Sequence, residues 1–187
     1  MTDPLKTGAT IGILGGGQLG RMLSVAAARL GFRTHIFEPG ANPPAADVAH
    51  SITTASYDNV EALAAFAKAC DVVTFEFENI PTDALDMIEG IMPIHPNREA
   101  LRTSQDRLIE KNFLQGLGLK VAPFADIASA DDLDAALKTI GAPSILKTRR
   151  FGYDGKGQSR LRSADDAASA FADMAGSPAI LEGFVEF

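Results

Sequence analysis

The chain has 187 residues, of which 46% are hydrophobic and 22% charged, a composition that supports a packed core and excludes a disordered chain. Its formal net charge of −7 excludes a general nucleic-acid binder, because such proteins usually carry a basic face, and we expect no nucleic-acid partner. The single cysteine, Cys70, excludes an internal disulfide and a cysteine-based zinc site.

The N-terminal part alternates strand-like and helix-like segments. Leu19, Met22, Leu23, Ala26 and Leu30 recur at helical spacing, and Gly31 ends that helix. We predict strands at residues 10–14, 34–37, 71–75 and 92–95, and helices at 18–30, at 59–68, from Pro81, and after the capping residue Asn97. This order predicts a parallel sheet with helices on both faces, a Rossmann-like domain over residues 1–103.

The pattern changes near residue 103 and predicts a smaller α+β unit over residues 104–180. Ser104 is expected to cap a helix over residues 105–117. The later elements are a strand at 121–127, a helix opened by Ser129 and Asp132, a strand ending at Lys147, a returning strand at 157–161, a helix opened by Ser163 and a strand at 179–181. Residues 181–187 are apolar and strand-like, without a terminating signal. A natural edge strand is one interpretation, but we favour a truncated chain, the N-terminal fragment of a longer protein, because the second unit has too few strands to cover its helices.

A first glycine loop lies between the first strand and the first helix. Gly15 to Gly20 fits the pattern G-x-G-x-x-G, and Glu38 lies at the end of the second strand. This context is typical of dinucleotide binding and makes an NAD(P)-dependent oxidoreductase one hypothesis. Another phosphate-bearing ligand and a purely structural turn are the alternatives at this loop.

A second glycine loop follows Lys147 and ends near Gln158. From Lys147 to Arg162 the chain has six cations and one anion, although the whole chain is acidic. Glycines allow backbone N–H groups to turn toward a ligand, and clustered Lys and Arg complement phosphate charge. A dehydrogenase has no evident use for this loop, so the loop favours a different polyanion.

Four motifs, taken in order, resemble the family of 5-(carboxyamino)imidazole ribonucleotide synthases, which are ATP-grasp ligases of purine biosynthesis. They are residues 15–22 (Gly-Gly-Gly-Gln-Leu-Gly-Arg-Met), residues 74–79 (Thr-Phe-Glu-Phe-Glu-Asn), Asp106-Arg107 with Lys111, and residues 153–158 (Tyr-Asp-Gly-Lys-Gly-Gln). The resemblance implies that residues 181–187 begin a hinge into a larger subdomain that this chain lacks. It also implies ATP-dependent carboxylation of aminoimidazole ribonucleotide with bicarbonate. Another ATP-grasp carboxylase and a non-catalytic nucleotide sensor are alternatives.

The same resemblance implies the site residues. ATP would be bound by Arg107, Lys147, the flap residues Gly152, Tyr153, Asp154, Gly155, Lys156, Gly157 and Gln158, and the hinge residues Glu182, Gly183, Phe184 and Val185. The ribonucleotide would be bound by Gln18, Leu19 and Glu76, with Glu76 accepting hydrogen bonds from ribose hydroxyls, which recasts the first glycine loop as a nucleotide-monophosphate site. Glu38 would then pair only with a helix terminus. Whether Tyr153, Asp154 and Lys156 also contact the ribonucleotide is left open.

The remaining expectations concern groups outside these motifs. Mg²⁺ prefers several oxygen ligands, and its ligands and the catalytic residues are expected beyond Phe187, with no metal site in this chain. The full-length protein is expected to be a homodimer. A membrane span needs ~18 apolar residues, and the chain has neither such a run nor a signal peptide, so we expect no membrane partner and a cytoplasmic location.

Overall fold

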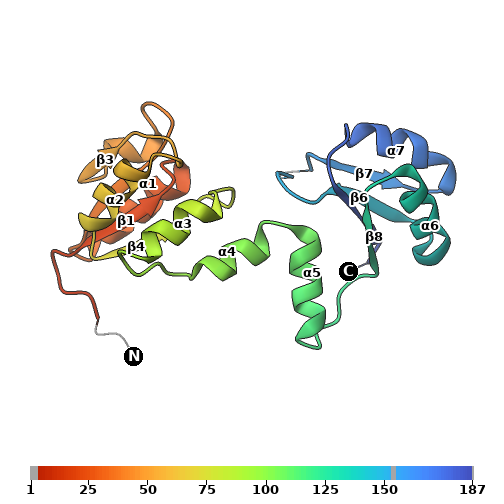
Figure 1. The fold of residues 1–187 in the computed structure, drawn as a ribbon, viewed down its shortest axis with the longest axis horizontal. Coiled ribbons are helices and arrows are strands. Elements are labelled where there is room, and N and C mark those ends of the chain that lie inside the picture. The colour runs from red at the N-terminus through yellow and green to blue at the C-terminus, as the bar shows by residue number, and fades with distance from the viewer. Residues whose placement is uncertain (1–3, 153–154, 187) are drawn as a thin grey trace. The chain divides into compact units, whose positions relative to one another are not determined.

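The computed structural model describes residues 4–152 and 155–186 and divides the chain into two compact units, Met1–Arg102 and Thr103–Phe187 (Figure 1). Each unit has its own four-stranded sheet and its own core. In the described part of the chain, every helix is too short or too polar to cross a membrane.

The first unit is built on a parallel sheet, as the sequence predicts. Its strands, in spatial order, are β3 (Ser51–Thr53), β2 (Arg33–Phe37), β1 (Thr10–Leu14) and β4 (Val72–Phe75). Its helices are α1 (Gln18–Arg29), the 3₁₀ helix η1 (Pro44–Asp47), α2 (Val60–Lys68), α3 (Thr82–Glu89) and α4 (Arg98–Ser104). Leu14 and Phe37 pack with α2 and α3, whereas Ile13 and Ile36 pack with η1 on the other face. The predicted Rossmann-like arrangement, with helices on both faces, is confirmed.

One predicted strand of the first unit does not form. In residues 92–95 only Ile94 makes a bridge, to Val73. Pro93 and Pro96 lack the N–H group that a continuing strand would donate, which explains why pairing stops there. The fourth strand is instead β3, a three-residue edge strand that the sequence pattern did not indicate.

The apolar face of α1 points away from its own unit. The buried residues of this helix are Gly20, Ser24 and Ala27, all small, whereas Met22 and Leu30 are 58% and 71% exposed. Helical spacing therefore predicted the helix correctly but did not identify the face that packs. Small residues on the inner face allow α1 to lie close to β1 and β2.

The second unit is built on an antiparallel sheet with the strand order β5 (Phe124–Ile127), β8 (Ala179–Gly183), β6 (Ser144–Thr148) and β7 (Gln158–Leu161). Its helices are α5 (Arg107–Gly116), α6 (Ala130–Ile140), the 3₁₀ helix η2 (Ala164–Asp166) and α7 (Ala167–Asp173). Leu146, Leu161 and Leu181 pack on one face of the sheet against α6 and α7. The opposite face is thus available for a site.

The start of α5 differs from the prediction. We expected Ser104 to cap a helix over residues 105–117, but Ser104 is the last residue of α4. Asp106 is the cap, and its carboxylate accepts hydrogen bonds from the N–H groups of Leu108 (2.9 Å) and Ile109 (3.3 Å). An ionised carboxylate is a stronger acceptor for these N–H groups than a hydroxyl, and it also complements the helix dipole.

Candidate nucleotide-binding site

Lys147 and Glu182 project from the face of the second sheet that α6 and α7 do not cover. In the β6–β8 ladder Ile145 lies opposite Glu182 and Lys147 lies opposite Ile180. Side chains alternate along a strand, so Leu146 and Leu181 enter the core and these four residues share the other face. The register of two strands far apart in the sequence therefore brings these two site candidates together.

Glu182 holds two lysines at once. Its Oε2 atom lies 3.0 Å from Nζ of Lys147 and 3.2 Å from Nζ of Lys111, which projects from α5. The three side chains are only 11–21% exposed. Two ammonium groups and one carboxylate leave one positive charge in excess, in a partly buried place where charge is weakly screened. The excess positive charge suits an anionic ligand. The ion pair with Glu182 fixes the position of the Lys147 side chain.

A cleft of about 500 Å³ lies beside these charges. Its wall is formed by Ala122, Ile145, Lys147 and the segment from Glu182 to Glu186, which includes all four predicted hinge residues. The guanidinium of Arg160 on β7 lies 4.4 Å from the centre of the Phe184 ring, a cation–π contact that supports this wall. The cleft therefore combines an apolar aromatic side with a cationic side.

The flap, residues 152–158, belongs to the connection from β6 to β7, which runs over residues 149–157, and it ends at the first residue of β7 (Figure 1). The N–H group of Thr148 donates to the carbonyl of Gly157 across its base, at 2.7 Å. Arg107 donates through Nε to the carbonyl of Thr148 (3.2 Å) and through Nη2 to that of Gly152 (3.1 Å). Arg107 thus ties α5 to the base of the flap. Tyr153 and Asp154, two predicted ligands, lie outside the described residues.

The glycines of the flap are required by its backbone. Gly155 and Gly157 have φ values of +79° and +67°, in the left-handed region that favours glycine. A Cβ atom on Gly157 would also lie 2.5 Å from Oγ1 of Thr148. Phe151 adopts a φ of +62°, so a bulky side chain occupies a left-handed position three residues after the end of β6.

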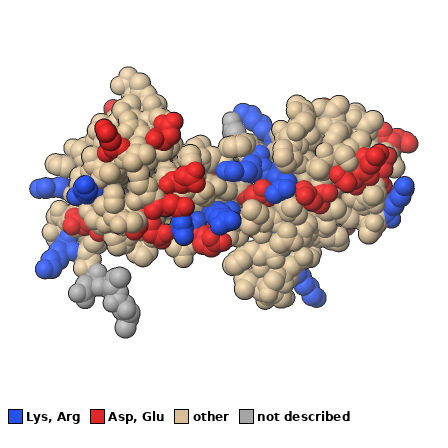
Figure 2. All heavy atoms as spheres, in the orientation of Figure 1, with Lys and Arg blue, Asp and Glu red and all other residues tan. Residues whose placement is uncertain are grey.

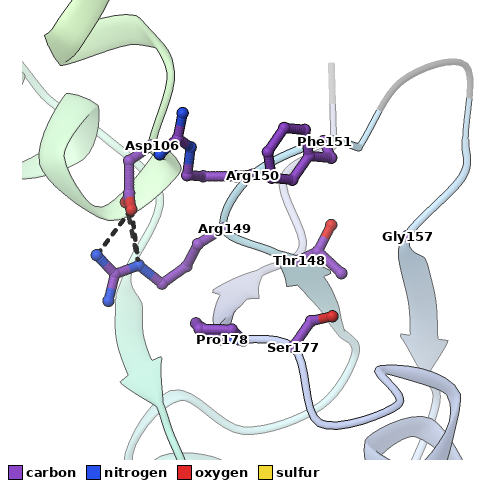
Figure 3. Close-up of a pocket in the computed structure, with 8 residues that line it drawn as sticks. All are labelled: Asp106, Thr148, Arg149, Arg150, Phe151, Gly157, Ser177 and Pro178. Atoms are coloured by element: carbon purple, nitrogen blue, oxygen red, sulfur yellow. Dashed lines mark hydrogen bonds and ion pairs between the residues drawn. The ribbon is translucent and has the colours of Figure 1, made fainter. Parts of the chain in front are cut away.

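A second hollow of about 510 Å³ lies at the base of the flap (Figure 3). It is lined by Asp106, Thr148, Arg149, Arg150, Phe151, Gly157, Ser177 and Pro178, several of which sequence reasoning did not single out. The Arg149 guanidinium forms a bidentate pair with Asp106, with contacts of 2.8 and 3.1 Å, and its Nη1 lies 3.3 Å from Asp126. Arg150 donates to the side-chain oxygen of Gln105.

Because of these contacts, not every cation of the second glycine loop is available to a ligand. Figure 2 shows basic side chains gathered around the flap with acidic side chains next to them. Arg149 is neutralised by Asp106 and ties the flap to the start of α5. We had counted Arg149 among the cations that could hold a polyanion, and the structure instead assigns it to the scaffold of the unit.

The Asp106–Arg149 pair should make the second unit sensitive to acid. Burial raises the pKa of the Asp106 carboxyl, but hydrogen bonds from Arg149, Ile109 and Leu108 outweigh burial and leave the pKa below its ordinary value. A depressed pKa stabilises the fold above the unfolded-state pKa, and this stabilisation is lost as the pH falls through the folded-state pKa. Below about pH 4 the free energy of unfolding should therefore fall more steeply in the wild type than in Asp106→Asn.

Urea unfolding at a series of pH values measures this difference. Asp134→Asn is the matched control, because Asp134 is exposed on α6 and has the same charge. It should keep the wild-type acid slope. Equal slopes for the wild type and Asp106→Asn would contradict the predicted role of the Asp106 carboxylate.

In the first unit, two carboxylates lie against the first glycine loop. The N–H group of Gly16 donates to Oε2 of Glu38, and that of Gly17 donates to Oε1 of Glu76, both at 2.8 Å. Glu38 thus pairs with the segment that opens α1, as expected. Gln18 and Leu19 follow Gly17 in the first turn of α1 and are exposed. Of the three predicted ribonucleotide residues, Glu76 contacts the loop directly, whereas Gln18 lines a separate hollow with Arg21 and Met22.

The carboxylate and imidazole groups of the chain bear on where a divalent metal could bind. Among residues 4–152 and 155–186, His, Cys, Asp and Glu form no group of three or more that could hold a metal ion. Mg²⁺ takes six oxygen ligands, usually from carboxylates, phosphates and water. The described residues therefore do not fit a magnesium site by themselves.

The flap, the lysine-bearing strand and the adjoining cleft on an antiparallel sheet define the ATP-grasp class, and residues 112–187 match the ATP-grasp domain model. The chain belongs to the family of the ribonucleotide synthetase preATP-grasp domain, whose model matches residues 8–105. Together the two matches account for both units of the fold.

Individual relatives agree with this assignment. The chain is 53% identical over 185 residues to the N5-carboxyaminoimidazole ribonucleotide synthase of Brucella melitensis, covering 98% of this chain and 51% of the relative. It also resembles an ADP complex of an N5-carboxyaminoimidazole ribonucleotide synthetase (TM-score 0.95, 40% identity, 100% of this chain and 50% of the other). A third match is the Aspergillus clavatus synthase in complex with ADP and 5-aminoimidazole ribonucleotide (TM-score 0.87, 31% identity, 97% and 48%).

These matches confirm the family assignment made from the four sequence motifs. The chain spans about half the length of the curated relatives it matches. The activity, the substrates and the roles of single residues in the whole protein are therefore matters for a proposal.

Proposed function

We propose that this chain forms the N-terminal half of an ATP-dependent ligase that carboxylates 5-aminoimidazole ribonucleotide with bicarbonate in purine biosynthesis. In this reaction a bicarbonate oxygen attacks the γ-phosphorus of ATP, ADP leaves, and carboxyphosphate forms. The exocyclic amine of the ribonucleotide then attacks the carbonyl carbon of the carboxyphosphate, loses a proton and displaces phosphate. The observation that carries the proposal is the Lys111–Glu182–Lys147 network beside the cleft and the glycine flap.

The nucleotide roles follow from the charges and surfaces of the second unit. Lys147 would meet phosphate oxygens as a point charge, held in place by Glu182. The flap from Gly152 to Gln158 would turn backbone N–H groups toward the same phosphates. Arg107 would act at the base of the flap, since its guanidinium already binds the carbonyls of Thr148 at the end of β6 and of Gly152 in the flap.

The base would lie in the cleft formed by residues 182–185. The N–H groups of Gly183 and Phe184 donate to the carbonyls of Pro123 and Pro143, at 2.8 and 3.1 Å. An adenine would therefore use other backbone groups, such as the N–H of Val185, together with apolar contact. The Arg160–Phe184 contact would keep the aromatic wall in position.

The remaining roles concern the first unit and the other half of the protein. We assign Gln18, Leu19 and Glu76 to the ribonucleotide, within a Rossmann-like domain of residues 1–103. Residues 104–180 would be the small ATP-grasp subdomain, and residues 181–187 would begin the hinge. Mg²⁺ ligands, catalytic residues and the bicarbonate site would lie beyond Phe187, in a cytoplasmic homodimer. A nicotinamide-dependent oxidoreductase is not favoured, because Glu38 and Glu76 hold the loop amides that a pyrophosphate would need.

A chimera tests the proposal. Residues 1–187 would replace the matching half of the Brucella melitensis relative, which is 53% identical. The chimera should hydrolyse ATP in the presence of bicarbonate, and 5-aminoimidazole ribonucleotide should couple this hydrolysis to carboxylated product. A chimera carrying Lys147→Ala should lose the activity, whereas Lys138→Ala, an exposed site on α6, should keep it. A folded chimera that binds ATP but forms no carboxylated product would refute the assignment.

A further inference from the structure

The first glycine loop is occupied by carboxylates of its own unit. Glu38 reaches the loop from the end of β2, and Glu76 reaches it from the end of β4. Glu38 accepts from Gly16 through Oε2 and from Gly40 through Oε1, which fixes both of its oxygens. Glu76 accepts from Gly17 through Oε1. Two adjacent amides at the start of α1 thus already have anionic acceptors.

The glycines of this loop make room for the same two side chains. A Cβ atom on Gly15 would lie 2.7 Å from Oε1 of Glu76, and one on Gly17 would lie 3.1 Å from it. A Cβ atom on Gly16 would meet Pro43 first, at 2.8 Å, and Cβ of Glu38 at 3.0 Å. The motif G-x-G-x-x-G therefore has a physical cause here that involves no phosphate.

The two carboxylates reverse the electrostatics of the helix N-terminus. A helix N-terminus carries about half a positive charge, and this charge normally attracts phosphate. Two full negative charges at Gly16 and Gly17 exceed it. The pKa of the nearby Tyr57 hydroxyl agrees with this field, since burial raises it and the charges of Glu38 and Glu76 raise it further. A neutral donor such as a hydroxyl is favoured over an anion.

We propose that Glu38 and Glu76 are specificity-determining residues that close the first glycine loop to phosphate and leave it to a neutral, hydroxyl-bearing part of a ligand. The loop amides then bind and position two carboxylates, and the negative charge of these carboxylates excludes dinucleotides as well as free phosphate. For the ribonucleotide, which rests on the proposed function, Glu76 keeps the ribose-hydroxyl role that the family resemblance implies, and the phosphate group lies away from Gly16 and Gly17. This inference corrects our expectation of a monophosphate site at the loop.

The test is a titration of the ¹⁵N-labelled chain with inorganic phosphate at constant ionic strength, followed at the amide resonances of Gly16 and Gly17. The wild type should show no saturable shift at these amides. The double variant Glu38→Ala/Glu76→Ala should gain a saturable shift, with a dissociation constant at least about tenfold below the highest phosphate concentration at which the wild type shows none, since one well-placed charge at a helix N-terminus has an effect of about this size. Glu78→Ala is the control, because Glu78 is exposed on the same segment as Glu76 and has the same charge.

Two results would overturn the inference. One is a saturable change in the amide chemical shifts of Gly16 and Gly17 when phosphate is added to the wild type. This result can be obtained without making any variant. The other is a folded double variant that still binds no phosphate there. If the alanine variant does not fold, Glu38→Gln/Glu76→Gln removes both charges while keeping the acceptors, and it should show a smaller gain. Failure of ADP binding at Lys147 would count against the proposed function without changing these amide shifts.

Discussion

Replacing Lys147 with alanine should lower the affinity of the chain for ADP by about tenfold to a hundredfold. One charge-assisted hydrogen bond to a phosphate contributes about 1.5–3 kcal/mol, and the Lys147 side chain is held in place by Glu182 at 3.0 Å. Lys147→Arg should recover only part of the affinity, because a planar guanidinium does not replace a compact ammonium between Glu182 and a phosphate. Isothermal titration calorimetry with ADP measures both changes.

The matched control for this experiment is Lys138→Ala. Lys138 is exposed in the last turn of α6, in the same unit, and its loss changes the net charge equally. Its affinity for ADP should stay at the wild-type value. If Lys147→Ala and Lys138→Ala lower the affinity equally, general charge and not a specific phosphate contact is responsible.

The second large effect is expected for stability. Asp106→Ala should lower the free energy of unfolding of the second unit by about 3 kcal/mol, because it removes a helix cap worth ~1 kcal/mol and leaves Arg149 without its bidentate partner. For a unit of this size the midpoint of thermal unfolding should fall by about 10–20 °C. Differential scanning calorimetry or circular dichroism measures the shift.

Asp126→Ala is the control for the Asp106 experiment. Asp126 contacts the same guanidinium at 3.3 Å, but its side chain is 50% exposed. An exposed ion pair contributes less than about 1 kcal/mol, so this variant should unfold within a few degrees of the wild type. A loss as large as that of Asp106→Ala would show that the capped, bidentate geometry is not the source of the stability.

Elements with strong local signals could be predicted from the sequence. The helix at residues 130–140 has a Ser129–Asp132 capping box, and the structure contains both of its hydrogen bonds. The hairpin around the flap was predicted from its glycines and apolar flanks and forms as β6 and β7. The strand at residues 92–95 and the cap at Ser104 were wrong, because prolines and a better capping carboxylate outweighed weak local patterns.

The candidate site was only partly predictable. Lys147 and Glu182 are 35 residues apart in the sequence, and their contact depends on the β6–β8 register. Lys111 belonged to a recognised motif, but no local pattern placed it on Glu182. Similarly, Arg149 was counted as a ligand cation because its partner Asp106 lies 43 residues away. Pairing over such separations leaves no periodic signal in the chain.

By itself the sequence determined the family, the order of two α/β units and the position of the two glycine loops, because glycines, caps and apolar periods act on the nearest residues. Only the tertiary structure decided which face of α1 packs and that Arg149 is paired with Asp106. It also showed that Glu38 and Glu76 accept hydrogen bonds from the amides of the first glycine loop. These properties depend on charges and surfaces that meet across strands and turns. The free energies of these contacts come from burial and charge pairing between residues that are far apart in the sequence. The order of residues along the chain does not indicate which of them will meet.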